Sequence, residues 1–258
     1  MANILHVPRR IIIPARQASS RFPGKILKLI AGKTMLQHVY ERAAACGFNS
    51  VLIATDCEQI AAAAKGFGAE VCMTSDQHST GTDRLAEAML KMGYDEDDII
   101  VNVQGDEPLI PIENVQQVAD NLALNTEAAV ATLCEPLHDI KEIMNPNIVK
   151  VVTDKAGMAL YFSRAAIPWV RGEFPERLSP GVNSYRHVGI YAYRGAFLQA
   201  YQRIVSSFIE QWEGLEQLRV LWHGYKIHVD IAKQKTLPGV DTYEDLQRVK
   251  RFLGDHSE

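Results

Sequence analysis

The chain has 258 residues, of which 47% are apolar and 22% are charged, and its formal net charge is −4. This length suits one large α/β domain or a core with an added lobe. The mildly negative charge argues against a general nucleic-acid binder, and no apolar run is long enough for a transmembrane helix. The four cysteines form no CxxC pair, so we interpret them as reduced thiols of a cytoplasmic protein.

Short apolar runs alternate with helical patterns in the first half of the chain. The strands expected there are residues 10–14, 50–56, 69–75, 98–104 and 128–133, and the helices are 35–47, 58–68 and 82–93. This alternation predicts right-handed βαβ units and a mostly parallel central sheet flanked by helices. The strands are apolar without alternation, which is typical of strands covered on both faces.

The pattern changes from about residue 148. Two strand patterns, 148–154 and 159–164, are separated by a short turn at Asp154–Gly157, which predicts a hairpin. Strands follow at 188–193 and 226–231, and the last helix is expected over 241–253. We therefore predict a single α/β unit, with a core of residues 1–135 plus 231–258 and a smaller mixed lobe of residues 136–230.

A cation-rich loop follows the first strand, in the sequence PARQASSRFPGK. It contains Arg16, Arg21 and Lys25 and no acidic residue. It is not a dinucleotide fingerprint, because G-x-G-x-x-G is absent, and it is not a P-loop, because Gly24-Lys25 is followed by Ile26. Ligands of parallel sheets bind at the carboxyl ends of strands, so these cations could hold a triphosphate. The alternative is a solvated surface loop.

Two acidic motifs are candidates for a magnesium site. Asp106 follows a buried strand in VNVQGDEP, where its carboxylate could hold Mg²⁺ or merely form a turn. Asp241 precedes Glu244 by three residues, so it could cap the last helix in a variant of the capping box. Locally the cap is the favoured interpretation of Asp241, and capping competes with metal binding for its oxygens.

Eight segments in order resemble the 3-deoxy-manno-octulosonate cytidylyltransferases, also called CMP-Kdo synthetases, where Kdo is 3-deoxy-D-manno-octulosonate. They are IPARQASSRFPGK, ATDCEQI, MTSDQHSTGTDRLAEA, VNVQGDEPLIP, NIVKVVTDKAGMALYFSRAAIPW, RHVGIYAYR, LEQLRVLWHGYKIHV and PGVDTYEDLQRV. The resemblance covers nearly the whole chain. It implies a fold like that of nucleotide-diphospho-sugar transferases and the reaction of CTP with Kdo to give CMP-Kdo and pyrophosphate, which activates Kdo for lipopolysaccharide biosynthesis.

The resemblance also implies roles for individual residues. The nucleotide-binding residues would be Pro14, Ala15, Arg16, Arg21, Lys25, Gly81, Arg84, Gln104 and Gly105. The sugar acid would contact Arg164, His187, Tyr191, Glu216 and Gln217, although His187 could also be a satisfied core histidine. Asp106 and Asp241 would bind Mg²⁺ and would act in catalysis with Arg16 and Lys25. Residues 136–230 would bind the sugar acid and join two copies into a homodimer.

Three rival functions remain open on the sequence. One is a cytidylyltransferase for a different ulosonic or neuraminic acid, or for an amino derivative of Kdo. Another is a glycosyltransferase that uses a finished nucleotide sugar with Mn²⁺. The last is a non-catalytic anion-binding module in which Asp106 and Asp241 are only turn and cap residues.

Overall fold

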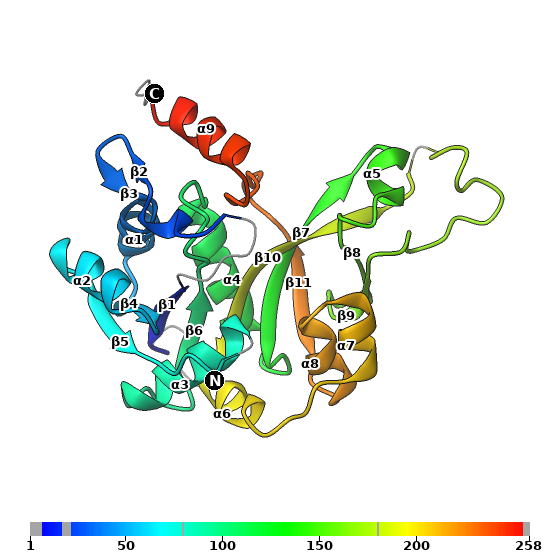
Figure 1. The fold of residues 1–258 in the computed structure, drawn as a ribbon. Helices are drawn as coiled ribbons and strands as arrows, with labels where there is room; N and C mark the ends of the chain where they lie inside the picture. The colour runs from blue at the N-terminus through cyan, green and yellow to red at the C-terminus, as the bar shows by residue number, and fades with distance from the viewer. Residues whose placement is uncertain (1–6, 17–21, 79, 180, 255–258) are drawn as a thin grey trace.

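The computed structural model describes residues 7–16, 22–78, 80–179 and 181–254 (Figure 1). Its strands are β1 Arg9–Ala15, β2 Leu29–Ile30, β3 Lys33–Thr34, β4 Ser50–Thr55, β5 Glu70–Met73, β6 Ile99–Asn102, β7 Val130–Leu137, β8 Lys150–Thr153, β9 Ala159–Ser163, β10 Ser184–Arg194 and β11 Ile227–Ile231. Its α-helices are α1 Met35–Ala44, α2 Glu58–Gly66, α3 Gly81–Lys91, α4 Ile112–Leu124, α5 Ile140–Met144, α6 Gly195–Tyr201, α7 Phe208–Glu213, α8 Gln217–Trp222 and α9 Tyr243–Phe252, with a 3-10 turn, η2, at Lys25–Leu27.

The central sheet has the strand order β11-β7-β10-β6-β1-β4-β5. Strands β6, β1, β4 and β5 pair with one another in parallel, as the strand–helix alternation predicts. Strand β10 runs antiparallel between β6 and β7, and β11 is parallel to β7. The sheet is therefore mostly parallel in the half that carries the ends of β1 and β6.

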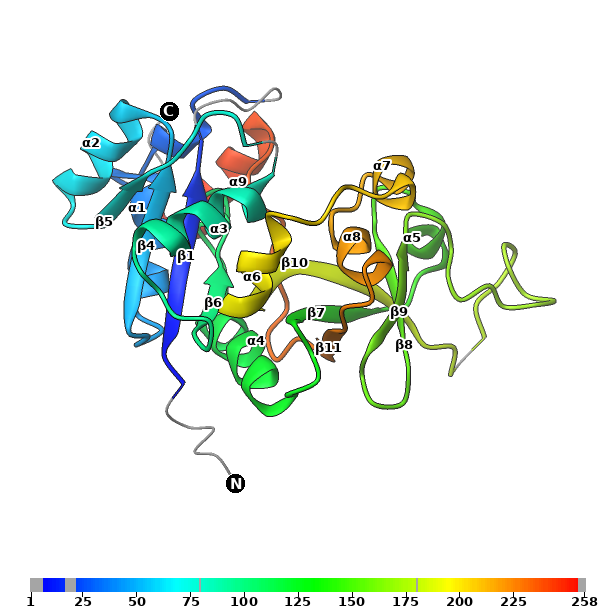
Figure 2. The ribbon, with the colours of Figure 1, turned by 90° about the horizontal axis from the view of Figure 1, so that it is seen from below.

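Helices cover both faces of this sheet, which explains the unbroken apolar runs of its strands. Ile11 and Ile13 of β1 belong to a core that includes residues of α1, α2 and α4, whereas Ile12 belongs to a second core with residues of α3, α6 and α8. All three isoleucines are fully buried. In Figure 2, α3 and α6 lie side by side on the second face. Because helices cover both faces of β1, a ligand can contact this strand only at its carboxyl end.

The second half of the chain builds a lobe beside the parallel strands (Figures 1 and 2). The predicted hairpin is confirmed, since β8 and β9 are antiparallel and Gly157 N donates to Asp154 O in the turn between them. Strand β8 also pairs with β10 at the Lys150–Arg186 position. Because β10 itself pairs with β6, one long strand belongs to both parts. The division at residues 136 and 230 stays a prediction.

The chain returns from the lobe to the core through residues 232–241. Val240 is buried with Ile30, Met35, Leu246 and Val249, so α9 is packed beside α1. Thr242, not Asp241, is the N-cap of α9, and its partner in a full capping box is Asp245. The predicted cap at Asp241 with Glu244 was therefore wrong by one residue. Thr242 is preferred because its hydroxyl reaches the Asp245 amide, at 3.2 Å.

No helix among the described residues is both long enough and apolar enough to span a bilayer.

Candidate active site

A cavity of about 300 Å³ opens at the carboxyl ends of β1 and β6 and the amino end of α3. Its lining includes most of the residues that the sequence singles out. They are Pro14, Ala15, Arg16, Lys25, Gly81, Arg84, Gln104, Gly105, Asp106, Tyr191, Glu216 and Asp241. Arg21 lies outside the described residues. Gly105 is needed at this point because a Cβ atom there would lie 3.2 Å from the Pro14 carbonyl oxygen.

Lys25 holds the two candidate metal ligands together. Its side chain is only 8% exposed, and its Nζ donates to Asp106 Oδ2 at 2.6 Å and to Asp241 Oδ1 at 3.0 Å. Although burial favours the neutral amine, the bonds and charges of both aspartates raise the pKa of Lys25 above its ordinary value. The lysine is therefore a cation, and two carboxylates 135 residues apart in the chain meet at one nitrogen.

Backbone bonds reinforce the same junction. Val240 N donates to Asp106 O at 2.9 Å, and Lys25 Nζ donates to Val240 O at 2.8 Å. Because Thr242 supplies the helix cap, the Asp241 carboxylate is not consumed by capping, and the competition expected from the sequence does not arise.

The pair of aspartates fits a magnesium site. Their side chains are 32% and 40% exposed and line the cavity, so a cation could reach them. Among the described residues, no group of three or more His, Cys, Asp or Glu side chains is placed to hold a metal. Magnesium commonly uses one or two carboxylates and takes its remaining ligands from water and substrate phosphates, so two are sufficient.

The amino end of α3 forms another wall of the cavity. Thr80 caps this helix by accepting from Asp83 N at 3.1 Å, and it also lines the cavity. Arg84, one turn on, is buried and is held by Asp56 at 2.8 Å and by the Thr74 hydroxyl. The Arg84 guanidinium is therefore a fixed part of the wall.

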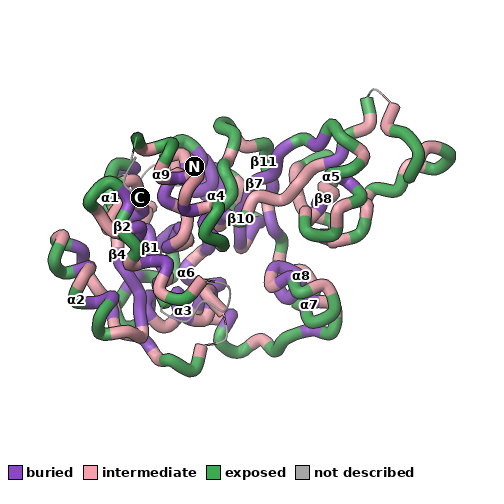
Figure 3. Tube along the Cα trace, turned by 45° about the horizontal axis from the view of Figure 1, so that its top comes forward, coloured by how far each residue is buried: buried purple, intermediate pink, exposed green. Residues whose placement is uncertain are grey.

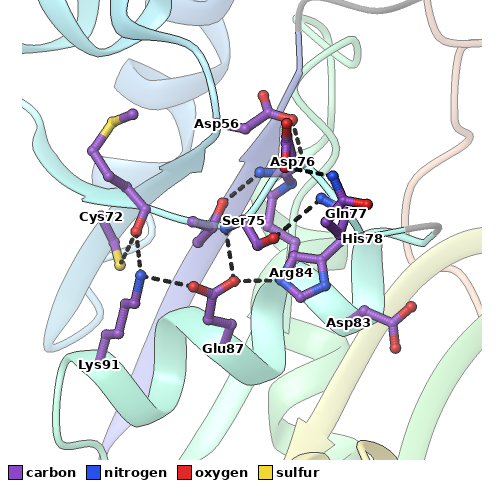
Figure 4. A network of polar contacts seen from close by, with 12 residues as sticks. Asp56, Cys72, Ser75, Asp76, Gln77, His78, Asp83, Arg84, Glu87 and Lys91 are labelled. Carbon is purple, nitrogen blue, oxygen red and sulfur yellow. Dashed lines mark hydrogen bonds and ion pairs between the residues drawn. The ribbon is translucent and has the colours of Figure 1, made fainter.

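A polar network anchors the loop that leads to α3 (Figure 4). Glu87 of α3 accepts from Ser75 N at 2.9 Å, contacts His78 Nε2 and pairs with Lys91 at 2.7 Å. Burial opposes ionisation of this carboxyl, but the bonds from Lys91, Ser75 and His78 outweigh it and lower the pKa of Glu87 to about 2. Since His78 lines the cavity, Glu87 fixes one of its edges.

A second cavity of about 250 Å³ adjoins the first and shares Thr82, Gln104, Tyr191, Tyr193 and Glu216 with it. It also includes Gln217, so three of the five predicted sugar-acid residues line it: Tyr191, Glu216 and Gln217. Tyr201 donates to Glu216 Oε1 at 2.7 Å and holds that carboxylate in place. Two connected cavities suit two substrates that must react with each other.

The other two predicted sugar-acid residues lie elsewhere. His187 lines a separate cavity of about 160 Å³, its Nε2 is 3.0 Å from the Thr132 hydroxyl, and burial lowers its pKa to about 3. It is therefore a neutral histidine with a partner inside the protein. The Arg164 guanidinium donates to the backbone carbonyls of Glu213 at 2.6 Å and Pro146 at 3.1 Å, and it lines none of these three cavities.

Several lining residues were not singled out from the sequence: His78, Thr82, Asn102 and Tyr193. A signal for Asn102 was present, because residues 102, 104 and 106 alternate along VNVQGD and side chains two apart on a strand share a face. Tyr193 stands two residues after Tyr191 by the same rule. Thr82 and His78 carry no comparable pattern.

Cations and two carboxylates around one cavity suit the binding of a nucleoside triphosphate with a metal ion, and the comparison with known families places the chain among the nucleotidyltransferases. The chain matches the cytidylyltransferase family over residues 10–227.

Its relatives narrow the class further. It is 53% identical to the 3-deoxy-manno-octulosonate cytidylyltransferase of Francisella tularensis subsp. novicida (strain U112) over 254 residues, 98% of this chain and 99% of that protein. It is 52% identical to the enzyme of the same name from Histophilus somni (strain 2336) over 250 residues, 94% of this chain and 97% of that protein. The chain belongs to the 3-deoxy-manno-octulosonate cytidylyltransferase family.

Solved structures agree. A CMP:2-keto-3-deoxy-manno-octonic acid synthetase complexed with CTP is 41% identical, with a TM-score of 0.87 over 97% of this chain and 100% of that chain. A cytidylyltransferase from Leptospira borgpetersenii, at 19% identity and a TM-score of 0.62 over 98% of this chain and 89% of that chain, shares the fold.

Proposed function

We propose that the protein transfers CMP from CTP to Kdo, with release of pyrophosphate, and so activates Kdo for lipopolysaccharide biosynthesis. The observation that carries the proposal is the pair of adjoining cavities, one lined by the cations Arg16, Lys25 and Arg84 and one by Tyr191, Glu216 and Gln217. Relatives that cover nearly the whole chain bear the name of this activity.

In the proposed reaction, the anomeric hydroxyl of Kdo attacks the α-phosphorus of CTP in line. The new O–P bond forms as the bond to the pyrophosphate oxygen breaks, and the hydroxyl proton leaves to solvent. Arg16 and Lys25 line the cavity and offset the charge that grows on the phosphoryl oxygens, as pre-oriented cations do. Asp106 and Asp241 would hold Mg²⁺, which supplies further positive charge to the phosphates. The Asp106–Lys25–Asp241 arrangement holds these charges in place before substrate binds.

The remaining predicted contacts complete the proposal. Gly81, Arg84 and Gln104 would surround the nucleoside, since all three line the first cavity. Arg164 and His187 stay candidates for the sugar acid. Arg164 donates to the carbonyl oxygens of Glu213 and Pro146 from Nε and Nη1, and since a guanidinium has five N–H donors, contact with a sugar acid would not require these bonds to break.

A product assay tests the function. With CTP, Mg²⁺ and Kdo, we expect equimolar CMP-Kdo and pyrophosphate. Parallel reactions with neuraminic acid and other ulosonic acids test the first rival, and a preference for one of them would overturn the choice of Kdo. Release of a nucleoside monophosphate or diphosphate from a nucleotide sugar would instead indicate a glycosyltransferase. Failure of Mg²⁺ to tighten CTP binding would favour the anion-binding module.

We also propose that the protein is cytoplasmic and forms a homodimer through the lobe of residues 136–230. Three aromatic side chains support an interface there. Phe208, Trp212 and Trp222 form a ring cluster with centroid distances of 4.7 and 4.9 Å, and they are 45%, 79% and 52% exposed. Figure 3 shows exposed residues along α7, which carries two of them. Clustered exposed aromatic side chains of this kind mark interaction surfaces.

A further inference from the structure

Asn102 has a buried carboxamide oxygen without a hydrogen-bond partner. The residue ends β6 and is only 3% exposed, and its Oδ1 is unpaired. Leaving a buried acceptor unsatisfied is unfavourable, so such an atom in a folded protein calls for an explanation.

The location of this oxygen separates it from the other unpaired atoms. Among the described residues, the buried unpaired side-chain atoms also include atoms of Asp98, Ser184, His228 and Arg248. None of those four residues lines any of the three cavities described above, whereas Asn102 lines the first cavity. Asn102 therefore belongs to the wall of the candidate active site, and its unpaired oxygen is buried within that wall.

Neighbouring strands and one helix hold the Asn102 side chain in place. Burial raises the pKa of the Tyr193 phenol, and the side chains of Thr82 and Asn102 beside its hydroxyl act in the opposite direction. A bond that favours the phenolate is one donated by the Asn102 amide NH₂, so the carbonyl oxygen is left to face elsewhere. The Tyr193 hydroxyl lies 3.4 Å from the Thr82 hydroxyl.

The surroundings of Asn102 indicate which part of the substrates meets it. In register it faces Tyr191 of β10, and Tyr191, Tyr193 and Thr82 line both the first and the second cavity. Asn102 thus lies where the two cavities join. Phosphates and carboxylates at neutral pH offer only acceptors, so neither can satisfy this oxygen. The hydroxyl groups of a ribose and of a sugar acid can.

We propose that Asn102 Oδ1 accepts a hydrogen bond from a substrate hydroxyl at the junction of the two cavities and thereby contributes to substrate selection. The inference rests on the proposed function, because it takes the substrates to be a ribonucleotide and a sugar acid. A site with a buried polar atom discriminates against an analogue that lacks the matching group, since the atom would then stay unpaired.

The test combines one substitution with substrates that lack single hydroxyls. Asn102→Leu keeps the side-chain size and removes the acceptor, and Asn102→Asp is the matched variant that keeps an oxygen acceptor. We expect N102L to lower kcat/KM for CTP or for Kdo by about 10-fold, the size of one lost hydrogen bond, and N102D to recover part of it. The analogues are 2′-deoxy-CTP, 3′-deoxy-CTP and deoxygenated Kdo derivatives.

The analogue that lacks the contacted hydroxyl identifies which substrate donates the hydrogen bond to Asn102. With that analogue, the difference between wild type and N102L should shrink to less than about twofold, because the bond is already absent. Shrinkage with a deoxy-CTP assigns the ribose, and shrinkage with a deoxy-Kdo assigns the sugar acid. The proposal is overturned if N102L shows no loss, or if its loss is the same with every substrate. Absence of CMP-Kdo formation by the wild type would instead refute the proposed function, and calorimetric binding of CTP and its deoxy analogues would still test Asn102.

Discussion

Lys25 shows how one residue can organise a site whose ligands come from distant parts of the chain. Its buried side chain touches both Asp106 and Asp241, at 2.6 and 3.0 Å. Paired carboxylates offset the cost of burying this ammonium. The sequence suggests Lys25 as a phosphate-binding cation. In the structure it is also the group that brings Asp106 and Asp241 together.

Removal of one member of this pair should abolish catalysis without unfolding the protein. We expect Asp106→Ala to lower turnover by at least about a hundredfold, because it deletes a candidate Mg²⁺ ligand and leaves Lys25 with one carboxylate. CMP-Kdo formation and the thermal midpoint are measured for both proteins. Glu58→Ala, an exposed substitution at the start of α2, is the control and should keep normal turnover. Near-normal turnover of D106A would remove Asp106 from the mechanism.

Glu87 should make stability depend on pH in the acid range. Its pKa is lowered from an ordinary value of 4.5 to about 2, so its contribution is complete above pH 4.5 and is lost as pH falls toward 2. We expect Glu87→Gln to lower the thermal midpoint at pH 7, and the gap to wild type to narrow between pH 5 and 2. A gap that stays constant over this range would show that ionised Glu87 does not hold the Ser75–His78 loop.

At the scale of elements, strand ends and helix starts supply the site, and each position depends on a local signal. Thr80 caps α3 beside the first cavity, and Thr242 caps α9 next to Asp241. Strand β6 ends at Asn102, and Gln104 and Asp106 of the following loop and turn line the same cavity. The side chains that line the cavity therefore come from the ends of strands and helices, where caps and strand pleating set the direction of the backbone.

Cap substitutions should separate stability from activity. Thr242→Ala and Thr34→Ala each remove an N-cap hydroxyl, from α9 and α1, and each should cost about 1 kcal/mol in the free energy of unfolding. Only T242A should also raise the Mg²⁺ concentration needed for half-maximal activity, because Thr242 adjoins Asp241. Denaturant unfolding and Mg²⁺ titration measure the two effects. If T34A raised the required Mg²⁺ concentration equally, the change would reflect a general loss of stability and not the position of Asp241.

At the scale of the whole molecule, strand β10 joins the lobe to the core. It pairs with β6 at one end and with β8 at the other, so motion of the lobe and of the sugar-acid residues is coupled to the sheet that carries Asn102. The exposed aromatic cluster of α7 and α8 lies on the same lobe. A dimer formed through it would cover apolar area that the monomer leaves in water.

The oligomeric state should therefore respond to a charge placed in that cluster. Trp212→Asp puts a carboxylate on the most exposed of the three rings, and we expect it to shift the protein from dimer to monomer in sedimentation-equilibrium measurements. Leu124→Asp, at an exposed apolar position on α4, is the matched control and should leave the mass unchanged. A wild-type protein that is already monomeric would refute the homodimer.

The sequence by itself determined the parallel core, the β8–β9 hairpin, and the loops that follow β1 and β6, because periodicity and turn residues are local properties of the chain. It also determined the family, through eight motifs in order. Only the tertiary structure decided that Asp106 and Asp241 meet at Lys25, that Thr242 caps α9, that His187 is a neutral histidine beside the Thr132 hydroxyl, and that Asn102 has an unpaired oxygen and lines the first cavity. Those facts depend on contacts between residues far apart in the chain and on which atoms are left without a partner after packing. A local sequence pattern contains neither kind of information.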